Sequence, residues 1–270
     1  MLQSVIKELL IVFIIFIPLE YLFPIWREKK AMRSLWRVDV IHVILTSALI
    51  TIVLVTAISG ISALINPVIS EPFRAAIAGQ PFILQFIEIV ILADIGYYFG
   101  HRAFHTFPLL WRFHAVHHSI EDMDALAAHR LHPIDQGLTR GLTLGPILLM
   151  GFEPGALGLF AICGHAQFLL IHSNINIPFG PLRWVIASPQ FHHWHHANHP
   201  QAYNRNFAGQ ISALDWIFGT AYLPDASSDA FPAAYGIDEP VGRDYADHLF
   251  GPFRPRPTHG PVQTVEEHPS

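Results

Sequence analysis

Charged side chains are scarce in this sequence. Aspartate, glutamate, lysine and arginine make up 14% of its 270 residues, whereas soluble domains contain about 25%. Hydrophobic residues make up 51%, and the mean hydropathy is +0.36. This composition argues against an ordinary soluble domain and predicts a membrane protein. The net charge is −5 and no long run of one sign occurs, so nothing points to nucleic-acid binding.

Cysteine is almost absent as well. Cys163 is the single one, so no disulfide can form within the chain. It lies in an apolar segment, where cysteine usually serves packing rather than chemistry.

Three apolar stretches predict membrane-spanning helices, at 5–25, 38–65 and 82–100. A signal peptide is the rival interpretation of the first stretch. Pro18 and Glu20 interrupt it, and no small-residue cleavage site follows, which favours a retained helix. Residues 66–81 contain three prolines and a glycine, and they predict a loop.

Basic residues predict how these spans are oriented. Segment 26–37 carries five lysines and arginines, whereas the loop after the second span has only Arg74. The positive-inside rule therefore places 26–37 in the cytoplasm. The third span then returns to this side, so His101 is expected on the cytoplasmic face.

Residues 137–172 are apolar again, with a break at 151–154. The first half has about 14 residues and reaches roughly 21 Å, short of the roughly 30 Å hydrocarbon core. A helical hairpin that enters and leaves on one side is expected.

This arrangement predicts an all-α integral membrane bundle with three spanning helices, the hairpin and a histidine-rich metal site on the cytoplasmic face. The expected parts are membrane spans and a basic loop at 1–81, a catalytic domain at 82–223, and a tail at 224–270 that is disordered from about 254.

Histidine is concentrated in one window. Of the 18 histidines, 14 lie between His101 and His199. Eight recur at i, i+3 or i+4, which brings imidazoles together along one side of a helix. These eight are His101, His105, His114, His117, His118, His192, His195 and His196. They are enough ligands for two metal ions, and imidazole suits iron, zinc or copper.

Other polar residues near these motifs are candidates for the surroundings of the metals. His172 directly follows the hairpin and is an open candidate for a ninth ligand. Asp94 and Tyr98 lie on the helix face of His101, and Asp94 is expected to orient a histidine from another cluster. His193 points away from the ligand face and is expected behind the ligands. His132 and His165 are weaker candidates.

The three motifs H-x3-H, H-x2-H-H and H-x2-H-H resemble those of the fatty acid hydroxylase/sterol desaturase superfamily of membrane diiron oxygenases. Arg130-x-His132-Pro133, the stretch from Ser188 to Phe191, Asn206 and the stretch from Leu214 to Thr220 are also similar to that family. The resemblance covers roughly 85–223 and implies two non-haem iron ions, with zinc as a substitute. It also implies O2-dependent hydroxylation or desaturation of a lipid of the sterol, fatty acyl, alkylglycerol or carotenoid type. Asn206 and Asp215 are expected to support the site.

No fused cytochrome b5 module is recognisable, so electrons are expected from a separate cytochrome b5-, ferredoxin- or flavoprotein-type system. Two other functions remain open from the residues. A zinc-dependent membrane hydrolase would need a glutamate beside its ligands, as in HExxH, and the three motifs contain none. A metal transporter or sensor would place its ligands along a path through the bilayer rather than on one face.

Overall fold

The computed structural model describes residues 2–30, 32–46, 49–50, 68–224 and 230–254. Within these ranges the regular structure is helical, as expected, and pairing between extended segments is limited to two isolated bridges, Pro24 with Ile175 and Ala197 with Tyr235. The expected disordered end and residues 47–48 and 51–65 of the second predicted span lie outside the described residues.

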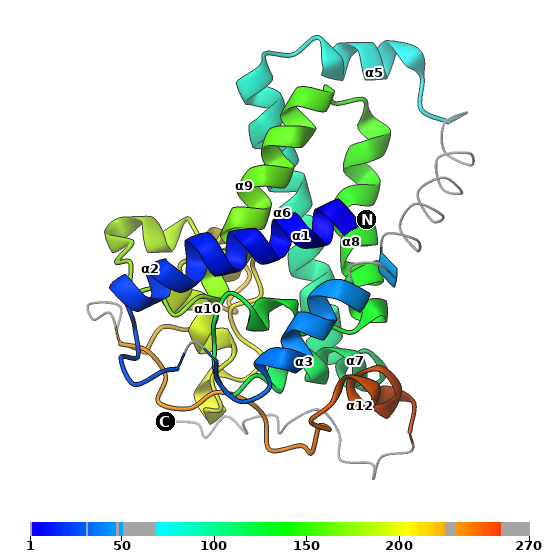
Figure 1. The fold of residues 1–270 in the computed structure, drawn as a ribbon. Helices are drawn as coiled ribbons and strands as arrows, with labels where there is room; N and C mark the ends of the chain where they lie inside the picture. The colour runs from blue at the N-terminus through cyan, green and yellow to red at the C-terminus, as the bar shows by residue number, and fades with distance from the viewer. Residues whose placement is uncertain (1, 31, 47–48, 51–67, 225–229, 255–270) are drawn as a thin grey trace, which may run out of the picture.

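Three long helices lie side by side, and the first of them packs against the other two (Figure 1). They are α6 (Phe82–Thr106), α8 (Pro133–Met150) and α9 (Pro154–His172). The helices α8 and α9 form the expected hairpin, with 18 and 19 residues, and Gly151 ends α8 at a φ of +91°. At Gly96, a Cβ atom would lie 2.4 Å from the Leu142 carbonyl oxygen, so α6 and α8 can approach this closely only at a glycine.

Within the described residues, two helices, α6 and α9, are long and apolar enough to cross a membrane. In the most apolar 18-residue stretch of each helix, only 28% (α6) and 22% (α9) is buried within the protein. The core helix of a soluble protein would be mostly buried. The third predicted span, 82–100, therefore corresponds to α6. The hairpin contributes α9 as the second candidate.

The first predicted span, 5–25, is not among these candidates in the described part of the chain. It divides into α1 (Leu2–Leu10), a π-helical turn η1 (Ile11–Phe16) and α2 (Ile17–Leu22), which cross the long helices in Figure 1. One side of this segment, including Val12, packs into a protein core with Leu169 of α9. Three spans are therefore not confirmed.

One side of the start of the second predicted span is also buried in the protein. This start comprises α3 (Trp36–Ile41) and the π-helical turn η2 (His42–Thr46). Asp39 is fully buried among arginines, and His42 Nε2 lies 2.9 Å from His248 Nδ1.

The prediction of a loop at 66–81 was wrong for its middle, which forms α5 (Glu71–Ala78). The Ser70 side chain accepts the Phe73 N–H as an N-cap, and Pro72 occupies the first turn, where its missing N–H costs nothing. Pro72 and Gly79 therefore mark the two ends of a helix rather than a continuous loop.

The basic segment 26–37 is partly buried. Arg33 bonds Asp124 and Asp39 at 2.6 Å each, and Arg130 bonds Asp39 at 2.7 Å. Lys29 lies 3.9 Å from Asp124. Two of the five cations that predict the orientation are thus neutralised inside the fold.

The remaining described helices are short, and those labelled in Figure 1 lie in its lower half, toward the C-terminal ends of α6 and α9. These are α7 (Pro108–His118), η3 (Ala127–His129), η4 (Gly180–Trp184), α10 (Pro189–His195), η5 (Pro200–Ala202), α11 (Ala213–Ile217), α12 (Tyr245–Phe250) and η6 (Gly251–Phe253). All three histidine motifs meet at this end.

Candidate metal centre

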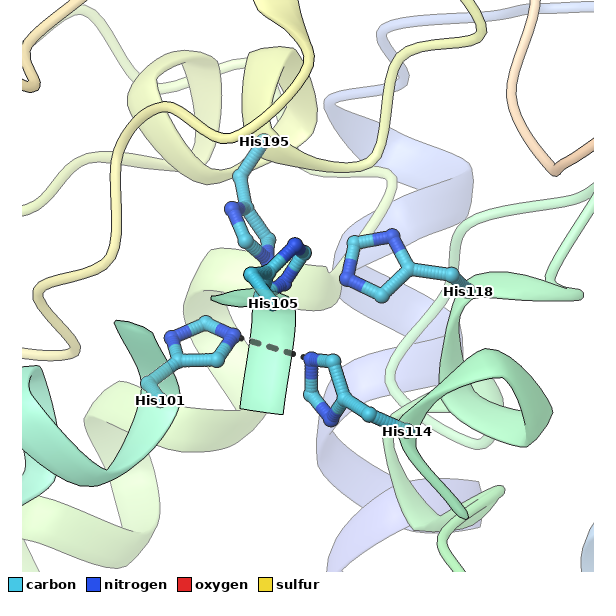
Figure 2. Close-up of side chains that lie close together, drawn as sticks. All are labelled: His101, His105, His114, His118 and His195. Atoms are coloured by element: carbon cyan, nitrogen blue, oxygen red, sulfur yellow. Dashed lines mark hydrogen bonds between the residues drawn. The ribbon is translucent and has the colours of Figure 1, made fainter. Parts of the chain in front are cut away.

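Nine buried histidines form two groups, and in each group the ligand atoms lie within 4.8 Å of one another. Group A contains five (Figure 2): His101, His105, His114, His118 and His195. Group B contains four: His117, His172, His192 and His196. These nine are the eight motif histidines together with His172, the open candidate from the sequence.

Helix α7 serves both groups, and so does α10. His114 and His118 of α7 belong to group A, whereas His117 belongs to group B. Positions i and i+4 are about 40° apart around a helix, whereas i+3 and i+4 are about 100° apart. An H-x2-H-H motif therefore directs two rings one way and the third another way. In α10 the division is reversed, with His195 in group A and His192 in group B.

The histidines are held in the form that binds metals. Each of the nine is exposed by 5% or less. Burial lowers the pKa of the following four well below the ordinary value, and neighbouring histidines lower it further: His117, His118, His192 and His196. Burial also lowers the pKa of His195 to about 3. Neutral imidazole, the ligand form, is therefore favoured at pH 7 for these five histidines.

Five rings donate their Nδ1–H to a fixed oxygen, which leaves Nε2 with its lone pair. The acceptors are carbonyl oxygens for four of them and a carboxylate for the fifth. The pairs are His101 with Phe207 at 2.7 Å, His114 with Asp135 at 2.7 Å, His117 with Arg130 at 3.2 Å, His172 with Phe168 at 2.8 Å and His195 with Arg205 at 2.7 Å.

The free Nε2 atoms face one another. His101 and His114 bring theirs to 3.0 Å, drawn as the dashed line in Figure 2. His117 and His172 bring theirs to 3.1 Å. Since both Nδ1 atoms of each pair are donors, two lone pairs meet without a proton between them. Ligands bound at about 2.1 Å to one ion lie roughly 3 Å apart at right angles, so these spacings fit a shared cation.

Other ring nitrogens in the two groups are buried without a hydrogen-bond partner. They are Nε2 of His105, His118 and His195, Nδ1 of His192, and both nitrogens of His196. Buried polar atoms normally have hydrogen-bond partners, so a cluster of buried nitrogens without partners needs an explanation. Metal coordination by the nine residues supplies one, and the residues present fit such ions.

The loop 205–211 supports group A through its backbone. The five backbone N–H groups from Phe207 to Ile211 all donate to two carboxylates. The first two donate to Asp215, and the last three donate to Asp94. The same loop supplies the carbonyl oxygens that accept from His101 and His195.

Asp94 therefore differs from the expectation that it orients a histidine directly. Within the described residues its carboxylate binds backbone N–H groups, and it reaches the histidines only through the loop. The sequence could not show this because the loop lies 115 residues further along the chain.

The other expected supporting residues lie around the same loop and α10. The Tyr98 hydroxyl lies 2.8 Å from Thr220 Oγ1, and Thr220 donates to Asp215. The Asn206 amide donates to the Phe191 carbonyl at 2.8 Å, which joins the loop to α10. His193 lies 2.7 Å from the Tyr235 hydroxyl.

The two weaker candidates lie outside both groups. His132 caps α8 by accepting the Ile134 N–H. His165 lies 2.8 Å from Glu8.

Asp135 was missed in the sequence, although its carboxylate accepts the Nδ1–H of His114. It is 2% exposed and also accepts the Thr139 hydroxyl at 3.1 Å. A carboxylate behind a metal-binding histidine is common. The sequence does contain a feature that could have identified Asp135. It is an acidic residue in the first turn of an apolar helix, two residues after Pro133 of the His132-Pro133 pair.

A cavity of about 570 Å³ opens beside the two groups, between α6, α8 and α9. Its inner end is lined by His101, His114 and His117. Its other end is lined by leucines of the hairpin, including Leu148 and Leu157. The site can therefore receive a molecule that is also in contact with the long apolar helices.

Comparisons with known proteins agree with this arrangement. The family model described as fatty acid hydroxylase matches residues 86–220. The chain is 28% identical to the ornithine lipid hydroxylase OlsE of Rhizobium tropici, over 80% of this chain and 65% of that protein. It is 32% identical to the alkylglycerol monooxygenase of Danio rerio, over 55% of this chain and 32% of that protein. The chain thus spans less than two thirds of either relative. No solved structure matches it.

Proposed function

Because the chain belongs to the fatty acid hydroxylase family, we propose that it is a membrane-bound oxygenase that hydroxylates or desaturates a lipid. The observation that carries this proposal is the pair of buried histidine groups beside a cavity that continues between long apolar helices. The two relatives described above are named as a hydroxylase and a monooxygenase, and each name specifies a lipid as the substrate of that protein.

We propose that groups A and B each hold one iron ion, through five and four histidines. When bound, the ions would supply the activation of O2 that attack on a C–H bond requires. The protein's part is to fix the ring orientations through the Nδ1 acceptors and to keep water from the cavity. Imidazole also suits zinc, which can substitute in isolated protein.

The same proposal places the enzyme in the bilayer as a multi-pass protein, with its active site on the cytoplasmic face. A separate cytochrome b5-, ferredoxin- or flavoprotein-type donor would supply electrons there. The positions of His105 and His172 support an active site on one face of the membrane. These residues lie at the C-terminal ends of α6 and α9 and belong to group A and group B, respectively. In this scheme 82–223 is the catalytic domain, 1–81 contains the N-terminal spans and the basic loop, and 224–270 is the C-terminal tail.

Metal analysis tests the function directly. Protein purified from iron-supplied cells is expected to contain about two iron ions per chain and to oxidise lipid only with O2 and a reductant. Chelation should abolish turnover, and ferrous iron should restore it. Zinc-only protein whose activity is unaffected by anaerobic conditions would contradict the proposal and favour a hydrolase.

Replacing Asp135 by asparagine should weaken iron binding by about 10–100-fold, because His114 loses its charged acceptor. Iron titration followed by spectroscopy measures this effect. Asp238→Asn is the matched control, since Asp238 is exposed and bonds only Asn198 among the described residues. Equal iron affinity in the Asp135 and Asp238 variants would remove Asp135 from the site.

A further inference from the structure

The cavity beside the histidines changes in polarity along its length. On α8, the lining residues nearest the metal groups are Asp135, Gln136, Thr139 and Arg140, whereas Leu144 and Leu148 line the part further along. At 1.5 Å per residue, Asp135 and Leu148 are about 20 Å apart. The polar half therefore adjoins the histidines, and the apolar half lies toward the hairpin turn.

Helix α9 forms the opposite wall. It runs antiparallel to α8 in the hairpin (Figure 1), so its C-terminal half faces the polar half of α8. That half of α9 lines the cavity with His165 and with the apolar Phe168 and Ile171, and Leu157 and Phe160 line it from the other half. The polar side chains near the histidines therefore come mainly from α8, and a polar headgroup would meet suitable partners there.

Arg140 is the only lysine or arginine between residues 137 and 172, the apolar hairpin. Arg140 is exposed, and its Nε donates to Gln136 at 2.9 Å. Among the described residues, no further hydrogen bond or ion pair holds its two terminal nitrogens, so they are available to a ligand in the cavity that Arg140 lines. The charge of Glu8 acts on Arg140, but Glu8 is itself held by His165 at 2.8 Å.

We propose that Arg140 binds a phosphate or carboxylate group of a lipid that enters with its headgroup toward the histidines. This assignment rests on the proposed function. The two terminal nitrogens of Arg140 suit a bidentate anion. Arg140 lies five residues from Asp135, about 7.5 Å along α8, so it belongs to the half of the cavity that adjoins the histidines. The oxidised carbon is therefore expected near the anionic group rather than near the end of the chain.

Three lipids with the same oleoyl chain test this proposal: oleoyl lysophosphatidic acid, N-oleoylglycine and monooleoylglycerol. Binding to the iron-loaded protein is measured by native mass spectrometry without reductant, and product position by tandem mass spectrometry after turnover. At least one of the two anionic lipids is expected to bind about 10-fold more tightly than the neutral lipid, a typical value for one charged contact. Its oxidation should fall near the headgroup.

Arg140→Gln should remove this preference without changing the iron content, and Arg140→Lys should retain most of it. Arg243→Gln is the matched control, because Arg243 lies outside the cavity and its side chain is 61% exposed. Wild-type binding in Arg140→Gln, preference for the neutral lipid, or oxidation near the chain end would each overturn the assignment.

Leu148→Trp provides an independent variant if Arg140→Gln does not fold. It narrows the apolar end, so it should shift the preference to shorter chains and leave the oxidised position relative to the headgroup unchanged. A change of oxidised position with unchanged chain-length preference would contradict headgroup-first entry. Wild-type protein that binds anionic lipid but never oxidises lipid would refute the oxygenase proposal while leaving the Arg140 binding result intact.

Discussion

Replacing His172 by alanine is expected to lower the bound iron from about two ions per chain to about one and to reduce lipid oxidation by more than about 100-fold. Group B has four histidines, one fewer than group A. His172 Nε2 lies 3.1 Å from that of His117 and 2.9 Å from that of His192, so its ring lies between two others of the group. Loss of a partner behind a ligand already costs about 10–100-fold, and loss of the ligand itself should cost more.

The controls for this experiment separate metal loss from misfolding. His199→Ala removes an exposed histidine from the same half of the chain and should keep both ions and full activity. His118→Ala and His195→Ala should also abolish activity, through group A, while the protein still inserts into membranes. Unchanged iron content and activity in His172→Ala would exclude His172 as a ligand and leave group B with three histidines.

The sequence predicted the histidine motifs and the hairpin because both depend on local periodicity. Spacing of four residues brings rings together on any helix, and the break at 151–154 divides an apolar run into two helices. The hairpin also explains why His172 returns to the motifs that precede it. This part of the site needed no knowledge of tertiary packing.

Which rings of one helix meet which rings of another was not predictable in the same way. It depends on how α7 and α10 are rotated against each other, which brings His118 and His195 to a ring distance of 4.7 Å. The partners of Asp94 and the buried positions of Lys29 and Arg33 likewise depend on residues about 90 or more positions away. A count of basic residues cannot distinguish a cation at the membrane surface from one that is paired inside the fold.

The pairing of Arg33 and Arg130 by Asp39 leads to the second large expected effect. Asp39→Ala should lower the free energy of unfolding by about 3–5 kcal/mol, because it leaves Arg130 buried without its counter-charge. Asp39 is fully buried and accepts from Arg130 at 2.7 and 2.9 Å. The backbone carbonyl of Arg130 accepts from His117, so iron binding to group B should weaken as well.

Unfolding by denaturant in detergent micelles measures this effect, and Glu121→Ala is its control. Glu121 lies 3.9 Å from Arg243, with side chains 66% and 61% exposed, and such a pair contributes about 0–1 kcal/mol. The double variant Asp39→Leu/Arg130→Met should recover part of the lost stability, since removing both charges avoids an unpaired buried cation. Equal stability of Asp39→Ala and Glu121→Ala would show that the ion pairs of Asp39 do not hold the N-terminal segment to the metal-binding half.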